Sequence, residues 1–198
     1  MRYSTPIIFL KYLQYYWVAA NSKGHGVHSP FVYQFIRDTL NASNSIKEIE
    51  QKEPAVTKLL QAIEDATTSQ IAPKITLLIA RLLQNWNPLT YSVTGDKNQF
   101  ENDSTFNTNQ SIESIDFAFI GEGQDETTML ENANKLIDKM HANSWVILHG
   151  IHTDSNMEAT WKQLKQHVKI RLTIDLFSIG ILFCRTAQKE KEHFIIRY

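Results

Sequence analysis

The stretch that decides the fold is SIDFAFIGEGQDETTML, from Ser114 to Leu130. Its first part, IDFAFI, is a continuous apolar run of the kind found in a strand that is covered on both faces. A helical pattern begins after the turn GEGQ. Many α/β proteins hold a nucleotide with a strand, a glycine-containing turn and a helix in this order. The neighbouring segments must show whether this turn has the residues that such a site needs.

The second half of the chain predicts a mostly parallel sheet. Two amphipathic helices, 125–143 and 155–167, alternate with short strand-like runs. These runs are LTYSVTG (89–95), SWVILHG (144–150), VKIRLTIDLF (168–177), GILFCR (180–185) and HFIIRY (193–198). The runs at 168–177 and 180–185 are close enough to pair as an antiparallel hairpin. The pattern therefore favours an α/β fold whose sheet ends in an antiparallel edge.

The first half of the chain, residues 1–87, predicts a helical extension to the α/β domain at 88–198. Helices are expected to begin at Pro30, with Ser29 as N-cap, and at Pro54 and Pro73, because proline is favoured in the first turn of a helix. We expect the two halves to form one compact unit. The polar segment that joins two of the strands, 96–114, is expected to be a loop.

Charge and apolar patterning limit the partners that the chain can have. The chain has 20 Lys and Arg residues and 21 Asp and Glu residues, so its net charge is close to zero. This charge gives no reason to expect a nucleic-acid partner. The first segment is interrupted by Lys11 and is too short to span a bilayer, and we place the protein in the cytoplasm with no membrane partner. An apolar stripe on this segment predicts packing on the protein's own core or in a homodimer. The stripe is Ile7, Leu10, Leu13 and Trp17.

Several short motifs carry a resemblance to a known family. They are HGVHSPFVYQFI (25–36), ATWKQLKQH (159–167), TIDLFSIGILFCR (173–185) and KEHFIIRY (191–198). In this order and spacing they resemble a bacterial family of class I S-adenosylmethionine-dependent methyltransferase-like proteins. The resemblance implies a Rossmann-like methyltransferase fold with a shortened, mostly parallel sheet, an antiparallel C-terminal hairpin and N-terminal helices.

The resemblance also implies where a cofactor would bind. Class I methyltransferases hold S-adenosylmethionine at the carboxyl ends of their strands. They use a glycine-rich turn after the first strand, an acid after the second, and polar groups after the fourth and fifth. If LTYSVTG is the first strand, Gly95 lies in its turn, and if it is the second, Asp96 is the acid. The corresponding later positions are Gly121, Glu122, His149 and His152.

The sequence departs from the family pattern at these positions. The usual Glu-Leu-Gly motif is absent, and the span from Thr90 to Phe117 is shorter than one βαβ unit of ~30 residues. The family typically has Asp-Gly-Asn-His after the fourth strand, where this chain has GEGQ, and Asp-Asp-Ile-His-Trp after the fifth, where it has HGIHT. Two hypotheses follow. The favoured one is a pseudoenzyme that binds no cofactor and acts as an interaction module; the other is an active methyltransferase that uses S-adenosylmethionine in a remodelled pocket.

Other polar clusters favour structural roles. The sequence predicts no catalytic nucleophile, and the single cysteine, Cys184, lies in a buried strand. His149, His152 and Asp154 form an HxxHxD motif whose residue types could bind a metal ion, but the sequence favours a pocket loop or a solvated turn here. His25 and His28 precede a helix start and are interpreted as partners of backbone groups.

Overall fold

Six strands form one mixed sheet in the computed structural model, which describes residues 2–21, 27–67, 70–95, 114–122 and 126–198. The strands are β1 (Tyr91–Thr94), β2 (Ile115–Ile120), β3 (Met140–His149), β4 (Leu172–Asp175), β5 (Ile179–Phe183) and β6 (Glu192–Ile195). Their order across the sheet is β1-β2-β3-β5-β4-β6. β1, β2 and β3 pair in parallel, β4 and β6 pair in parallel, and β5 is antiparallel to both β3 and β4. The chain is therefore an α/β protein with a C-terminal hairpin, as predicted.

The antiparallel strand lies inside the sheet, so the expected antiparallel edge is wrong. β5 is buried along its whole length, and a strand of this kind needs neighbours on both sides. β6 instead forms the edge beside β4, and its side chains alternate between half-buried and exposed. The turn between β4 and β5 is tight: Phe177 has a left-handed backbone with φ 66°, and its N–H donates to Oδ1 of Asp175 at 2.9 Å.

The predicted helix starts at Pro30, Pro54 and Pro73 are confirmed. Ser29 is at the N-cap position of the first of these helices, but its side chain makes no capping hydrogen bond. A further helix follows Ser45, which forms a capping box with Glu48. The helices before the sheet are α1 (Thr5–Val18), α2 (Pro30–Phe35), a π-helical turn η1 (Ile36–Leu40), α3 (Ile46–Lys52), α4 (Pro54–Ala66) and α5 (Pro73–Trp86). Within the strand region lie α6 (Glu126–Asp138) and α7 (Ser155–Leu164).

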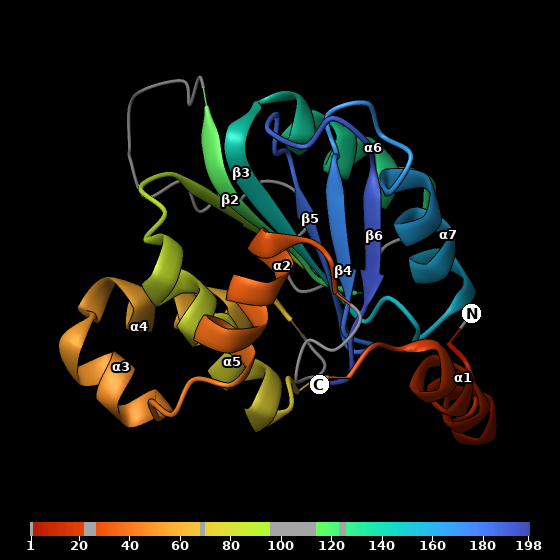
Figure 1. Ribbon diagram of the computed structural model, residues 1–198, viewed down its shortest axis with the longest axis horizontal. Helices are drawn as coiled ribbons and strands as arrows, with labels where there is room; N and C mark the ends of the chain where they lie inside the picture. The colour runs from red at the N-terminus through yellow and green to blue at the C-terminus, as the bar shows by residue number, and fades with distance from the viewer. Residues whose placement is uncertain (1, 22–26, 68–69, 96–113, 123–125) are drawn as a thin grey trace.

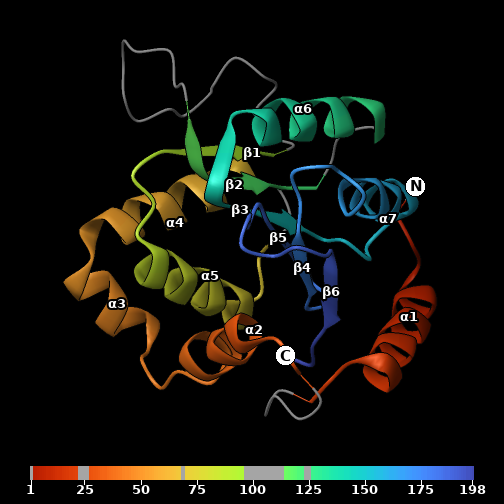
Figure 2. The same cartoon turned by 45° about the horizontal axis from the view of Figure 1, so that its top comes forward.

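Helices cover both faces of the sheet (Figure 2). The alternation along β2 divides the core, because Phe117 and Phe119 face one helical layer while Ala118 and Ile120 face the other. The first layer is formed by α2 to α5, and its core is continuous with Trp145 of β3. The second layer is formed by α6 and α7. The helical segment before residue 88 and the α/β segment after it therefore share one hydrophobic cluster.

Helix α1 lies apart from both layers, beside α7 and the end of β6 (Figure 1). Its only buried side chain is Tyr15, whose hydroxyl donates to the carbonyl oxygen of Ile196. Short bridges flank the helix on either side, between Arg2 and Asp154 and between Ala20 and Ile196. No helix among the described segments is both long and apolar enough to cross a membrane. The segment 96–113, most of the predicted loop, lies outside the described residues.

Candidate functional site

The carboxyl ends of the parallel strands meet at one edge of the sheet, where α/β proteins usually bind ligands. Most of the residues predicted from sequence as remnants of a cofactor site lie there. Gly95 follows β1, Gly121 and Glu122 follow β2, and His149 ends β3. His152 lies three residues beyond that strand, in the turn before α7. Asp96 lies outside the described residues, so its predicted role is open.

Gly95 and Gly121 are packed against the protein's own chain. A Cβ atom at Gly95 would lie 1.9 Å from the carbonyl oxygen of Ala66, the last residue of α4. A Cβ atom at Gly121 would lie 3.1 Å from Cγ2 of Thr67 and 3.2 Å from Cα of Gly95. The N–H of Gly121 also donates to the carbonyl oxygen of Thr94 at 2.7 Å. The space that these glycines leave is therefore filled by the end of α4 and by each other.

Glu122 and His149 form a buried pair across the ends of β2 and β3. Nδ1 of His149 lies 3.2 Å from Oε1 of Glu122. Arg2 approaches the other carboxylate oxygen at 3.8 Å. Burial alone would raise the pKa of Glu122, but His149 and Arg2 outweigh it and hold that pKa below its ordinary value. Gly150, with φ 73°, is required here because its Cβ would lie 2.5 Å from the Glu122 carboxyl carbon.

His152 lies between two carboxylates. Its Nε2 atom is 2.9 Å from Oδ2 of Asp175, the last residue of β4, and its Nδ1 atom is 3.3 Å from Oε1 of Glu158 in α7. Its ring also stacks on Phe177, with 5.2 Å between ring centres. Burial alone would lower the pKa of His152, but the two carboxylates outweigh that effect and raise it above its ordinary value. The two carboxylates thus favour the protonated form of the ring.

Two residues at the N-terminus complete this ion network. Nζ of Lys11 lies 2.6 Å from Oε1 of Glu158, and the hydroxyl of Tyr3 donates to Oε2 of the same carboxylate at 2.9 Å. Burial alone would raise the pKa of Glu158, but Lys11, His152 and Tyr3 together lower it. With His152 and Lys11 positive and Glu158 and Asp175 negative, the network is balanced in charge.

A cavity of about 220 Å³ lies beside this network. Lys11, Tyr15 and Val18 of α1 line one side, and His152, Glu158 and Asp175 line the other. The ionisable groups of Lys11, His152, Glu158 and Asp175 that face it are already paired with one another. Such a network ties α1 to the ends of the strands, and it offers neither an activated nucleophile nor an unpaired base.

The HxxHxD motif does not converge on one point. His149 faces Glu122, His152 faces Asp175 and Glu158, and Asp154 caps α7 by accepting from the N–H of Met157 at 2.9 Å. Among the described residues, no group of three or more His, Cys, Asp or Glu side chains is placed to hold a metal ion. His28 is exposed, and His25 lies outside the described residues.

Sequence reasoning missed the partners of His152. Asp175 ends a predicted strand, and the rule that functional groups follow strand ends could have marked it. Glu158 and Lys11 carried no comparable signal, because each is a single charged residue on an amphipathic helix. Their meeting depends on how α1 and α7 dock at the sheet edge.

Comparison with known proteins adds no assignment. No protein-family model matches the chain, and no curated protein is similar to it in sequence. The α/β fold and the geometry at the strand ends are therefore the basis for a functional proposal.

Proposed function

We propose that this protein is a methyltransferase-like protein with a degenerate cofactor site that acts as a non-catalytic interaction module. The main support for this proposal is the packing of Gly95 and Gly121. A cofactor site needs glycine at such a turn so that the ligand can approach the backbone. Here the end of α4 makes that close approach instead. The α/β sheet with its antiparallel C-terminal hairpin is compatible with the Rossmann-like methyltransferase fold that the sequence motifs suggest.

The charges at the strand ends also support loss of the cofactor. Glu122 is nearly buried, its carboxylate is held by His149 and Arg2, and it covers Gly150. An acid that binds ribose hydroxyls must instead face an open crevice with free oxygen atoms. The other acid at this edge, Asp175, accepts from His152 and from the backbone of Phe177. Neither carboxylate is left free for a ligand.

A titration with S-adenosylmethionine and its demethylated product tests this part of the proposal. We expect isothermal titration calorimetry to detect no binding, or a dissociation constant well above about 1 μM, the value that corresponds to a binding free energy of ~−8 kcal/mol. Micromolar or tighter binding would instead favour the alternative, an active methyltransferase with a remodelled pocket.

The interaction surface that we propose is the outer face of α1. At 3.6 residues per turn, the stripe Ile7, Leu10, Leu13 and Trp17 lies on the side of the helix opposite the buried Tyr15. All four side chains are exposed, and Trp17 is 83% exposed. Monomeric proteins rarely expose a contiguous apolar patch of this kind. A second copy of the chain is the proposed partner, since a helix face can meet its own equivalent about a two-fold axis.

The size and chemistry of this face are suited to self-association. Eight large apolar side chains on this one helix are exposed. They are Ile7, Phe9, Leu10, Tyr12, Leu13, Tyr16, Trp17 and Val18. Trp17 is 83% exposed, so most of the ~150–250 Å² that a fully buried aromatic residue contributes is still available to a partner. Lys11, the one charged residue of α1, is turned to Glu158 and leaves the stripe uncharged.

The oligomeric state tests the interaction surface. We expect the wild-type protein to sediment as a dimer and Trp17→Glu to sediment as a folded monomer, because a charge in the interface would be desolvated. Val168→Glu is the matched control: Val168 is also apolar and 73% exposed, but it lies after α7. A wild-type monomer at high concentration, or equal effects of the two variants, would contradict the proposed dimer.

A further inference from the structure

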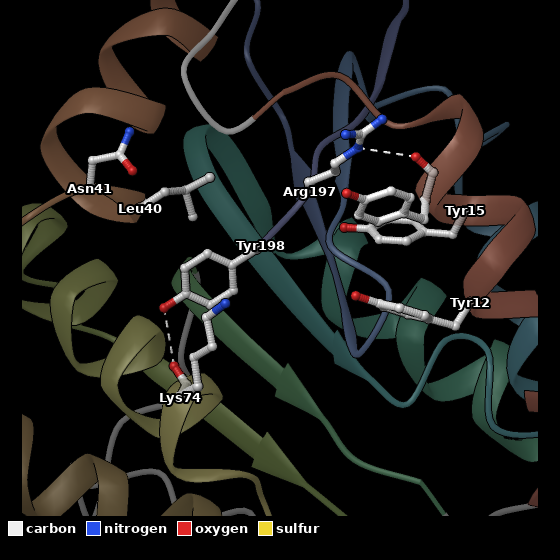
Figure 3. A pocket seen from close by; sticks show the side chains of 8 residues that line it. Tyr12, Tyr15, Leu40, Asn41, Lys74, Arg197 and Tyr198 are labelled. Atoms are coloured by element: carbon white, nitrogen blue, oxygen red, sulfur yellow. Dashed lines mark hydrogen bonds between the residues drawn. The ribbon is translucent and has the colours of Figure 1, made fainter. Parts of the chain in front are cut away.

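A second cavity, of about 330 Å³, lies at the end of the sheet edge where the chain finishes (Figure 3). Tyr12 and Tyr15 of α1 face across it toward Tyr198, and Leu40 at the end of η1 lies beside Tyr198 (Figure 3). Lys74, in the first turn of α5, lies on the same side as Tyr198 (Figure 3). The walls therefore come from segments that are far apart in sequence and are brought together only by the fold.

The side chains that line this cavity carry positive charge only. Lys74 and Arg197 both line it, and no acidic side chain does. Neither cation forms an ion pair within the described part of the chain. The nearby carboxylate of Asp175, which acts on Tyr15, is paired with His152. Two unpaired cations at one cavity attract an anion.

Both cations are held in place by aromatic rings. The guanidinium of Arg197 lies 4.1 Å from the ring centre of Tyr16, and its Nε atom donates to the Tyr16 carbonyl oxygen at 3.0 Å. Its two terminal nitrogens remain for a bidentate contact with a carboxylate or phosphate. Nζ of Lys74 lies 4.2 Å from the ring centre of Tyr198, whose hydroxyl donates to the Lys74 carbonyl oxygen at 3.2 Å. Cations held in this way lose little freedom on binding a ligand.

The rings also define the uncharged part of the ligand. Four tyrosines line the cavity: Tyr12, Tyr15, Tyr16 and Tyr198. Tyrosine rings stack on flat groups, and the hydroxyls of Tyr15 and Tyr198 fix two of these rings by donating to the carbonyl oxygens of Ile196 and Lys74. The volume is near the lower end of the ~300–1,000 Å³ range of small-molecule pockets. We propose that this cavity binds a small aromatic anion, with Arg197 and Lys74 holding the charged group and the tyrosines holding the ring.

Titration of the protein with simple probes tests this proposal. The probes are 4-hydroxybenzoate, phenyl phosphate and the neutral 4-hydroxybenzamide, followed by ligand-observed NMR and calorimetry. We expect at least one anion to bind with a dissociation constant of ~1 mM or tighter and the neutral amide to bind at least about tenfold more weakly. A preference between the two anions shows whether the site takes a carboxylate or a phosphate.

Three variants test whether the anion binds in this cavity. Arg197→Gln and Lys74→Gln should each weaken the bound anion by about tenfold or more, because each removes a charge-assisted contact. Lys58→Gln, at an exposed lysine of α4, is the matched control and should leave binding unchanged. Lys74 is itself exposed, so its variant should fold normally even if Arg197→Gln does not. Equal binding of the neutral amide, no binding of either anion, or anion binding unaffected by Lys74→Gln overturns the proposal.

Discussion

Nε2 of His152 lies 2.9 Å from Oδ2 of Asp175, although His152 follows β3 and Asp175 ends β4, and these strands are not neighbours in the sheet. β5 separates β3 from β4, and the turn after β3 carries His152 across its end. The contact joins the two halves of the sheet at the edge where α1 docks. The protonation of one histidine is therefore coupled to the position of the N-terminal helix.

The stability of the protein should depend on pH through His152. Its pKa is raised in the native state, so its stabilising contribution is complete below the ordinary value of ~6.5 and is lost as the pH rises through the native pKa. His152→Gln should remove this dependence. Urea unfolding of both proteins from about pH 5.5, below the ordinary pKa of histidine, to about pH 9 would measure this pH dependence. His28→Gln, at an exposed histidine, should keep the wild-type profile.

Removing the carboxylate partner should cost more at low pH than at high pH. Asp175→Asn should lower the free energy of unfolding by ~1.5–3 kcal/mol where His152 is protonated, since a charged hydrogen bond is lost. The cost should shrink once His152 is neutral. Urea titrations at two pH values, one on each side of the native pKa, would measure the difference. A cost independent of pH would mean that Asp175 stabilises the turn through Phe177 alone.

Gly95→Ala should destabilise the protein in the absence of any ligand. The added Cβ would meet the backbone oxygen of Ala66, which cannot rotate away, so the end of α4 or β1 must shift. Overpacking of this kind costs ~1–3 kcal/mol. Gly121→Ala, whose nearest atom is the side-chain Cγ2 of Thr67 at 3.1 Å, should cost less. Thermal unfolding of the two variants would show the order, and an unchanged melting temperature for Gly95→Ala would contradict the packing role.

Phe119→Ala should lower the free energy of unfolding by ~3–5 kcal/mol, because a fully buried aromatic ring leaves a cavity in the core. The prediction that the IDFAFI strand is covered on both faces is confirmed, since Phe117 and Phe119 face one core cluster and Ala118 and Ile120 the other. Leu89→Ala is a suitable control, since Leu89 is 84% exposed just before β1. Chemical denaturation of both variants would separate the effects. A small loss for Phe119→Ala would mean that the core relaxes around the missing ring.

Cys184 should react slowly with thiol reagents in the native protein. Burial raises the pKa of its thiol to about 11, against an ordinary value of 9.0, which reduces the thiolate fraction at pH 8 roughly a hundredfold. Labelling with a chromogenic disulfide reagent should become fast in urea. Immediate labelling without denaturant would show that the strand end opens readily.

The sequence predicted the elements better than their arrangement. Helix starts at Pro30, Pro54 and Pro73 depend on local backbone preferences, so they could be placed from the residues themselves. The hairpin of β4 and β5 followed from the short separation of two apolar runs. The insertion of β5 between β3 and β4 could not be predicted, because the order of strands is decided by packing across the whole sheet.

The candidate site shows the same limit. Gly95, Gly121, Glu122, His149 and His152 were placed correctly at strand ends, since their position follows from the strands. Their partners could not be predicted. Ala66 reaches Gly95 only because α4 ends beside β1, and Lys11 reaches Glu158 only because α1 docks on α7. The outward direction of the α1 stripe likewise depends on which face of the helix Tyr15 anchors.

The contacts of α1 can form only late, because they join segments that are far apart in the sequence. Tyr15 donates to the carbonyl of Ile196, and Ala20 pairs with the same residue, so α1 docks on a segment that is made much later than the helix itself. Domains are synthesised at ~5–20 residues per second, and contacts of such long sequence separation form late. The apolar helix is therefore without its intramolecular partners through most of translation. During that interval its apolar side chains are open to contact with other molecules.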